Sequence, residues 1–240
     1  MGAQPAWCTL SLSMPQADAA WIDGFLDGFL ELALMHDVAL VGGDTTRGPL
    51  SVCVTAHGFV ETGSALLRSG ARVGDDIWAS GTLGDAAGAL ARMQAGNAVD
   101  PELRVRLDRP TPRIELGRAL RGIANACIDV SDGLLADIGH VCMASTVGAE
   151  VEIDALPATA ALRSAFDEGS RRTLQATGGD DYELCFTAGE SKRSELESVA
   201  RASGVDATRI GRIIEGEGVV ALDAGGKRWF PPRGGYAHFA

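Results

Sequence analysis

Residues 128–134, which read Ile-Asp-Val-Ser-Asp-Gly-Leu, decide how this chain folds. The apolar approach at residues 124–128 predicts a short buried strand that ends at Asp129. Ser131 is a favourable helix N-cap residue, and the apolar spacing of residues 134–141 predicts a helix after it. The stretch therefore predicts a turn that leads from a strand into a helix.

Two carboxylates flank this turn, at Asp129 and Asp132. The start of a helix carries unpaired amide donors and the positive end of the helix dipole. A polyanion bridged by Mg²⁺ fits such a turn, with the carboxylates on the metal and the amides facing phosphate oxygens. The alternative is that Asp132 is an ordinary first-turn acid and Asp129 a turn residue. This stretch alone leaves both interpretations open.

The composition is that of an ordinary globular protein. Hydrophobic residues make up 46% of the 240 residues, a length that suits one large domain or two modest ones. The formal net charge of −11 repels nucleic acid and anionic membranes, so we expect neither as a partner. No apolar run approaches the ~18 residues of a membrane-spanning helix. The five cysteines form no CxxC motif, which favours reduced thiols in a cytoplasmic protein.

The first part of the chain predicts two strands and a helix before a glycine-rich motif. Residues 7–14 alternate as a half-buried strand, and residues 17–36 have the spacing of an amphipathic helix. A short buried strand at 38–41 then runs into Gly-Gly-Asp-Thr-Thr-Arg-Gly at 42–48. Two glycines before an acid predict a sharp turn that can approach a ligand closely. Asp44 is there a candidate metal ligand.

The rest of the chain alternates between predicted strands and helices. Pro110 and Pro112 bracket a linker, so we place a domain boundary there and expect domains at 1–110 and 111–240. A second Gly-Gly-Asp occurs at 178–180, next to a predicted strand. We expect strands at 50–61, 77–80, 149–153 and 184–187, two short strands within 210–222, and helices at 85–94, 114–123, 156–166 and 191–203, the last with Ser191 as N-cap.

The acidic turns at strand ends, together with the absence of a GxxxxGK[ST] sequence, favour metal-assisted phosphate chemistry outside the P-loop class. No general base stands out. A phosphate-monoester acceptor needs none, because its second pKa is about 6 and it is already anionic at neutral pH. Two polyanions repel by about 4 kcal/mol per charge pair at an effective dielectric near 20. Mg²⁺ ions on aspartates would offset that repulsion.

In combination, these motifs resemble the thiamine-monophosphate kinase family, whose superfamily includes aminoimidazole ribonucleotide synthetase and selenophosphate synthetase. The resemblance covers essentially the whole chain. It implies a two-domain, PurM-like α/β (α+β) architecture with mixed sheets packed by helices. It also implies direct, Mg²⁺-assisted transfer of the ATP γ-phosphoryl group to thiamine monophosphate. The motifs are VGGDTTRGPL at 41–50, RSGARVGDDIWASGTLGDAAGAL at 68–90, DRPTPR at 108–113, DVSDGLLADIGH at 129–140, GGDDYELCF at 178–186 and GYAHF at 235–239.

The resemblance also implies a set of site residues. A carboxylate and an aromatic face suit the cationic thiazolium of the acceptor, and many relatives carry Glu where this chain has Asp180. No residue is implied as a general base. The implied metal ligands are Asp44, Asp129 and Asp132, the ATP contacts are Gly43, Arg68 and Ser131, and the thiamine pocket contains Asp180 and Tyr236.

In the family, the segment that resembles the start of this chain lies well inside the protein. The resemblance therefore implies a truncated first domain that lacks strands, further metal-binding aspartates and part of the ATP site. We expect an unpaired sheet edge in that domain and weak or no kinase activity from this chain alone. Relatives form homodimers through the first domain, so the missing strands weaken the expectation of a dimer here.

Three alternatives to a thiamine-monophosphate kinase stay open from the sequence. The first is a sister enzyme of the superfamily, such as a selenophosphate or aminoimidazole ribonucleotide synthetase-like protein or the hydrogenase-maturation relative. The second is a truncated module that binds nucleotide or thiamine phosphate without turnover. The third takes the aspartates as turn and cap residues only, and predicts that Asp44→Asn and Asp129→Asn leave the affinity for Mg·nucleotide unchanged.

Overall fold

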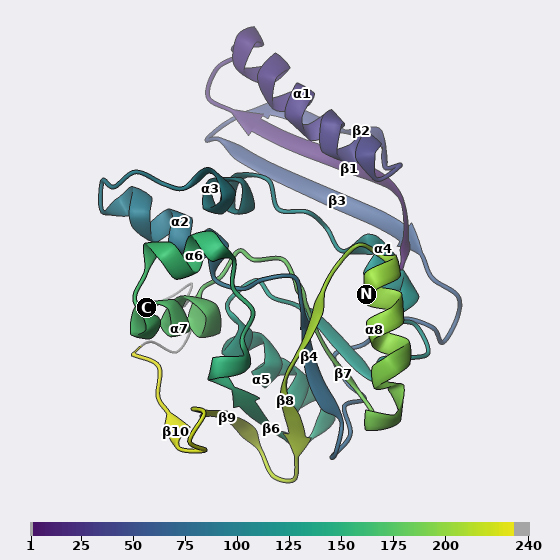
Figure 1. The fold of residues 1–240 in the computed structure, drawn as a ribbon. Helices are drawn as coiled ribbons and strands as arrows, with labels where there is room; N and C mark the ends of the chain where they lie inside the picture. The colour runs from purple at the N-terminus through teal and green to yellow at the C-terminus, as the bar shows by residue number, and fades with distance from the viewer. Residues whose placement is uncertain (1, 233–240) are drawn as a thin grey trace. The chain divides into compact units, whose positions relative to one another are not determined.

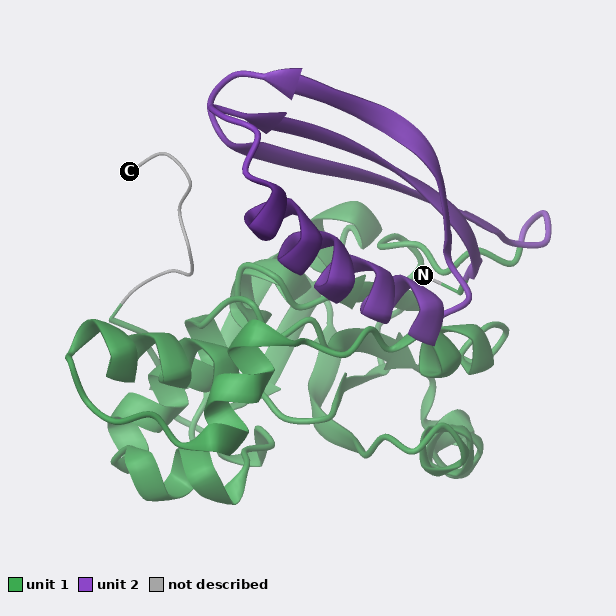
Figure 2. Ribbon diagram, turned by 90° about the horizontal axis from the view of Figure 1, so that it is seen from above, with its two compact units in different colours: residues 1–2, 64–240 green, residues 3–63 purple. Residues whose placement is uncertain are grey.

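The computed structural model describes residues 2–232, and the chain divides into two compact units. The smaller unit comprises residues 3–63, and the larger comprises residues 1–2 and 64–240 (Figure 2). Tyr236, which the resemblance places in the thiamine pocket, lies outside the described residues. Within residues 2–232 no helix is both long enough and apolar enough to cross a membrane.

The smaller unit is a three-stranded sheet with one helix on its face (Figure 1). The central strand is β1 (Gln4–Met14), which pairs in parallel with β2 (Ala39–Arg47) and antiparallel with β3 (Ser51–Phe59). The helix α1 (Ala19–Met35) connects β1 to β2, and the side chain of its N-cap residue Asp18 accepts the amide of the third helical residue. Both β2 and β3 are edges of this sheet within the unit.

The alternation predicted for the first strand is confirmed. From Cys8 to Met14 every second side chain of β1 is buried, among them Leu10 and Leu12, because this face of the strand packs against α1. The helix contributes Phe25 and its apolar neighbours to the same small core. The strand predicted at residues 38–41 exists as the start of β2, but its side chains are partly or fully exposed.

The sharp turn predicted at residues 42–48 is wrong. β2 continues through this motif because its residues pair with β1, with Gly43 opposite Leu10, after a register shift that skips Val41 of β2. Gly43 has a φ of 149°, and a Cβ added there would lie 1.8 Å from the carbonyl oxygen of Leu10. The glycine therefore permits a close approach between two strands rather than a turn.

We expect Gly43→Ala to destabilise the smaller unit by roughly 1–3 kcal/mol, because the added methyl group collides with the backbone of β1. Gly42→Ala is a matched control, since a Cβ at Gly42 meets no atom within 4 Å. Hydrogen exchange of the β1 amides measures the stability of this unit separately from the rest of the chain. Equal losses of protection in the two variants would contradict the proposed role of Gly43.

The larger unit is built on a seven-stranded mixed sheet with the order β10-β9-β6-β8-β4-β7-β5 (Figure 1). All neighbouring pairs are antiparallel except β6 and β9, which are parallel. The proline-rich stretch at 110–112 lies inside this unit. The strands are β4 (Asp76–Ser80), β5 (Ala126–Asp129), β6 (Gly148–Glu152), β7 (Leu184–Ala188), β8 (Ala207–Ile214), β9 (Gly218–Leu222) and β10 (Arg228–Trp229).

Helices cover both faces of this sheet. On one face α5 packs over Ile77 and Ile128, and on the other α4 and α8 pack over Trp78 and Phe186. A smaller apolar cluster joins α2, α3 and α6. The helices are α2 (Asp85–Gln94), α3 (Pro101–Asp108), α4 (Ile114–Ala119), α5 (Leu134–Ser145), α6 (Ala160–Ala165), α7 (Glu168–Thr177) and α8 (Arg193–Ala202), with short 3₁₀ segments η1 (Ile153–Ala155) and η2 (Glu190–Lys192).

Two helices, α3 and α7, escaped the sequence prediction. Each buries very few side chains, Leu103 in α3 and Gln175 with Ala176 in α7, so neither has an apolar stripe at helical spacing. The helix predicted at 156–166 is shorter, because residues 156–159 are irregular and Thr159 caps α6, accepting the amide of Leu162. Ser191 lies in η2 and does not cap α8, whose N-cap position is occupied by the next residue along.

Candidate functional site

The turn between β5 and α5 has the strand-to-helix course that the sequence predicts. β5 ends at Asp129 and α5 begins at Leu134. The prediction that Ser131 caps the helix is wrong, because the N-cap residue is Gly133, which has a φ of 113° and no capping side chain. A Cβ at Gly133 would lie 2.7 Å from the carbonyl carbon of Thr177, so this position requires glycine.

The cap is supplied from inside the helix by Asp137. Its Oδ2 accepts the amide of Ser131 at 3.0 Å and the amide of Asp132 at 3.1 Å. Burial raises the pKa of Asp137, the two amide bonds oppose that effect, and the charges of Asp132 and Asp129 add to it. The amides that the sequence analysis assigned to phosphate oxygens are therefore already occupied at Ser131 and Asp132.

Residues 178–183, which contain the second Gly-Gly-Asp, run directly beside this turn. A Cβ at Gly179 would lie 2.5 Å from the carbonyl oxygen of Ser131, so the two backbones touch. Three backbone hydrogen bonds join them, from the amide of Asp180 to the oxygen of Ser131 (3.0 Å), from the amide of Tyr182 to the oxygen of Val130 (2.9 Å), and from the amide of Val130 to the oxygen of Glu183 (2.8 Å).

Tyr182 marks the place where the predicted carboxylates of the larger unit gather. Its hydroxyl donates to Oδ1 of Asp180 at 3.2 Å. Burial raises the pKa of Tyr182, and the negative charges of Asp180, Asp129 and Asp132 raise it further. The backbone bonds from residues 180 and 182 to Ser131 and Val130 hold the segment of this ring beside the turn that carries Asp129 and Asp132. Tyr182 was not predicted as a site residue, because a single tyrosine after an acidic turn forms no recognisable pattern.

The segment that carries Tyr182 has an unusual backbone. Asp180 and Tyr182 have φ values of 67° and 50°, in the left-handed region that side-chain-bearing residues rarely adopt. Such conformations persist only where the surrounding structure holds them. The contacts that hold residues 180–182 in this conformation include those of the next residue, Glu183.

Glu183 is completely buried and is held by two arginines. Arg113 donates through Nε to Oε2 at 2.7 Å and through Nη2 to Oε1 at 2.5 Å, a two-pronged ion pair. Arg106 donates through Nη2 to Oε1 at 2.8 Å, and the hydroxyl of Ser80 donates to Oε2 at 2.6 Å. The hydrogen bonds to Glu183 raise the pKa of Arg113 above its ordinary value. This network anchors residues 180–183 at their end.

A second buried acid, Asp181, ties the same segment to the start of α2. Its Oδ2 accepts the amide of Gly84 at 2.7 Å. Burial raises the pKa of Asp181 well above its usual range; the bond from Gly84 lowers it and the charge of Asp85 raises it. Within the described part of the chain its Oδ1 has no hydrogen-bond partner. Residues 180–183 thus connect the β5–α5 turn with the loop that precedes α2.

The other predicted site residues lie elsewhere in the chain. Gly43 and Asp44 belong to β2 in the smaller unit, where Asp44 is exposed and pairs in register with Ser11 of β1. Arg68 is exposed in the larger unit, and its carbonyl oxygen accepts the hydroxyl of Ser145 at the end of α5. Among residues 2–232 no group of three or more His, Cys, Asp or Glu side chains is arranged to hold a metal ion.

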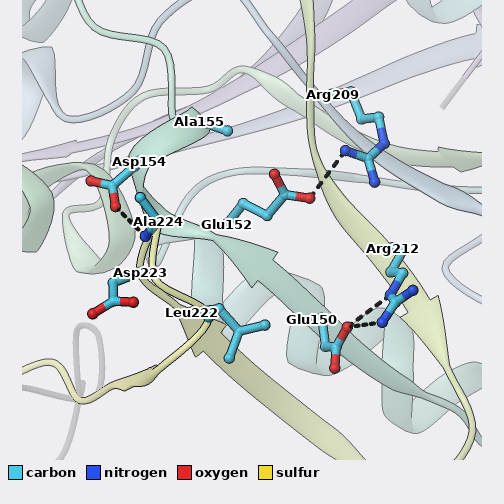
Figure 3. A pocket seen from close by; sticks show the side chains of 10 residues that line it. Glu150, Glu152, Asp154, Ala155, Arg209, Arg212, Leu222, Asp223 and Ala224 are labelled. Carbon is cyan, nitrogen blue, oxygen red and sulfur yellow. Dashed lines mark hydrogen bonds and ion pairs between the residues drawn. The ribbon is translucent and has the colours of Figure 1, made fainter.

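A pocket of about 510 Å³ lies on the larger unit between β6, β8 and the end of β9 (Figure 3). It is rich in charge, but its side chains bind one another. Glu152 pairs with Arg209 at 3.0 Å, and Glu150 pairs with Arg212 at 2.7 Å. Asp154 accepts the backbone amide of Ala224 at 2.7 Å. Since none of the predicted site residues lines this pocket, we do not place the chemistry here.

A smaller, more apolar pocket of about 270 Å³ adjoins the candidate site in sequence. Its lining includes Leu135 and Ala136, just after the β5–α5 turn, and Thr177, just before the second Gly-Gly-Asp. Trp229 and Phe230 form part of its wall. None of the predicted site residues lines this pocket either, but its apolar lining and aromatic wall suit a flat heterocycle.

Two related family models match most of the chain. Residues 1–60 match the model described as AIR synthase related protein, N-terminal domain. Residues 72–223 match the corresponding C-terminal domain. The observed two-sheet, mixed α/β fold agrees with these matches and confirms the PurM-like architecture expected from the sequence.

Individual relatives agree on a narrower family. Thiamine-monophosphate kinase of Salmonella typhimurium is 44% identical over all of this chain and 75% of its own length. The crystal structure of thiamine-monophosphate kinase from Stenotrophomonas maltophilia K279a, 53% identical, covers 92% of this chain and 73% of its own, with a TM-score of 0.89. AaThiL complexed with AMPPCP and TMP, 30% identical, covers 99% of this chain and 75% of its own, with a TM-score of 0.86.

Proposed function

Because the chain belongs to the thiamine-monophosphate kinase family, we propose that it transfers the γ-phosphoryl group of ATP to thiamine monophosphate, giving thiamine diphosphate and ADP. The observation that carries this proposal is the direct backbone contact between the turn that carries Asp129 and Asp132 and the segment that carries Asp180. A group of carboxylates suits a reaction between two phosphorylated molecules only if cations lie between the carboxylates and the phosphates. The relative AaThiL binds AMPPCP and TMP, which fits the same pair of substrates.

The donor atoms of this turn fit Mg²⁺, which prefers carboxylate oxygens. Asp129 and Asp132 would hold the ion, and Asp44 on β2 remains a proposed ligand. Bound Mg²⁺ supplies neutralisation of the charge that develops on the transferred phosphoryl group. The closure of the Ser131 and Asp132 amides by Asp137 supports this proposal, because a phosphate at these two residues would need a cation as intermediary.

We place the acceptor, thiamine monophosphate, next to Asp180, in the segment that runs beside the β5–α5 turn. Its carboxylate, oriented by the hydroxyl of Tyr182, would attract the positive charge of the thiazolium, and the adjoining apolar pocket would receive the rings. The acceptor phosphate is already an anionic nucleophile at neutral pH, so no side chain has to remove a proton. Gly43, Arg68 and Ser131 remain the proposed contacts of ATP, and Tyr236 a proposed contact of thiamine.

We also propose that the protein is cytoplasmic and that it forms a homodimer. All five cysteines are free, as the sequence predicts for a cytoplasmic protein, where thiols stay reduced and ATP is available. The resemblance also implies a homodimer, and light scattering on the full chain measures the oligomeric state directly.

The test of the proposed function is an assay of the purified 240-residue chain with ATP, thiamine monophosphate and Mg²⁺. We expect thiamine diphosphate and ADP in equal amounts, and no product when EDTA removes the divalent ion. The rate of thiamine diphosphate formation also tests the expectation of weak or no kinase activity from this chain alone. ADP formation without thiamine diphosphate, or turnover with selenide or an aminoimidazole precursor in its place, would favour a sister enzyme. Mg²⁺-dependent binding of AMPPCP without any turnover would favour a non-catalytic binding module.

A further inference from the structure

We propose that Asp137 is a positioning residue that shapes the β5–α5 turn for metal-bridged phosphate and closes the turn to direct phosphate binding. This inference rests on the proposed function and adds a residue to it. Asp137 is 2% exposed and lies one turn into α5, so it does not face solvent. Its Oδ2 accepts two consecutive amides of the turn, those of Ser131 and Asp132.

The first consequence is that the turn cannot bind phosphate directly through the amides of Ser131 and Asp132. The start of a helix ordinarily binds phosphate because its first amides are unpaired. Here an internal carboxylate takes up the amides of Ser131 and Asp132 at 3.0 and 3.1 Å. Its negative charge also opposes the helix dipole at the same place. A bare phosphate therefore finds neither free amides at these two residues nor a positive field, and needs a cation as intermediary.

The second consequence concerns the direction in which the side chains of Asp129 and Asp132 point. Asp129 and Asp132 lie on either side of the peptide groups that Asp137 holds. Hydrogen bonds to an ionised acceptor are among the stronger ones, so this pair fixes the turn backbone more firmly than a hydroxyl cap would. On the outer side the same turn is held by the three bonds to residues 180–183. Asp137 thus sets where the two carboxylates point without itself contacting substrate.

The experiment compares Asp137→Ala with Asp137→Asn in the full chain. Asparagine keeps an oxygen that can accept both amides, whereas alanine removes the acceptor. Two probes are titrated by calorimetry: AMPPCP with Mg²⁺, and inorganic tripolyphosphate in EDTA. Asp223→Ala is the matched control, because one oxygen of Asp223 likewise accepts two backbone amides, those of Gly225 and Lys227, in a turn that carries no predicted site residue.

We expect Asp137→Ala to weaken Mg²⁺-dependent AMPPCP binding by about 10–100-fold, the usual effect of losing a group that orients metal ligands. The same variant should bind tripolyphosphate in EDTA more tightly than the unsubstituted chain, because two amides become free and one negative charge is gone. Asp137→Asn should stay within about threefold of the unsubstituted chain for AMPPCP, since the hydrogen bonds survive. The control should change neither affinity.

Two outcomes would overturn the inference. Loss of binding to both probes in Asp137→Ala would mean that the residue merely supports the fold. A loss above about tenfold in Asp137→Asn would mean that its charge, not its hydrogen bonds, is what matters. Amide hydrogen exchange at residues 131 and 132 provides a readout independent of nucleotide: protection should fall in Asp137→Ala and persist in Asp137→Asn. The exchange result does not depend on kinase activity. Failure of the proposed function can therefore be distinguished from failure of the inference about Asp137.

Discussion

Asp129→Asn is expected to lower kcat/KM for thiamine-monophosphate phosphorylation by on the order of 10²–10³-fold. Asparagine has nearly the same shape but lacks the charge that would hold Mg²⁺ at the end of β5. Neutralisation of phosphoryl charge by a metal contributes several kcal/mol to catalysis, and each 1.4 kcal/mol is about tenfold in rate. The loss should appear as a higher Mg²⁺ requirement in addition to a lower rate, which steady-state assays over a range of Mg²⁺ concentrations measure.

Asp154→Asn is the control for this substitution. Asp154 is also a partly exposed carboxylate of the larger unit, but it lies in the charged pocket of Figure 3 and not at the β5–α5 turn. We expect it to leave kcat/KM nearly unchanged. The opposite pattern, with Asp154→Asn inactive and Asp129→Asn active, would move the chemistry to that pocket and refute the site assigned here.

The second large effect is expected for Arg113→Leu, which should lower the free energy of unfolding of the larger unit by roughly 3–5 kcal/mol. Arg113 makes the two-pronged ion pair with Glu183, a residue with no exposed surface. Without Arg113, the Glu183 carboxylate stays buried with an incomplete set of partners. Urea-dependent hydrogen exchange of the β4 amides, in the strand that carries the buried Trp78, measures the change in this unit.

A second substitution separates the ion pair from simple loss of packing. Glu183→Gln in the Arg113→Leu background removes a buried charge that retains only Arg106 as an ionic partner, so the double variant should be more stable than Arg113→Leu alone. Arg212→Leu is the surface control: its pair with Glu150 is largely exposed, and such pairs contribute about 0–1 kcal/mol. A double variant less stable than Arg113→Leu would contradict the proposed cost of an incompletely paired buried charge.

Local patterns were sufficient to predict most of the sheet and much of the β5–α5 turn. The alternation of β1 reflects one buried face, and α2 was predicted at the residues where it is found, Asp85–Gln94. The strand end at Asp129 and the helix start at Leu134 follow from apolar spacing within a dozen residues. These features depend on neighbours in the chain, so the sequence contains their cause.

What the sequence determined by itself was therefore most of the strands, several helices, the β5–α5 turn and, through its motifs, the family. Tertiary structure alone decided that the Gly-Gly-Asp at 42–44 lies in a strand, because β1 supplies its pairing partner. It also decided that Asp137 caps the turn and that Arg113 reaches Glu183, seventy positions away in the sequence. Contacts of this kind depend on which segments meet after folding, and no local periodicity encodes them.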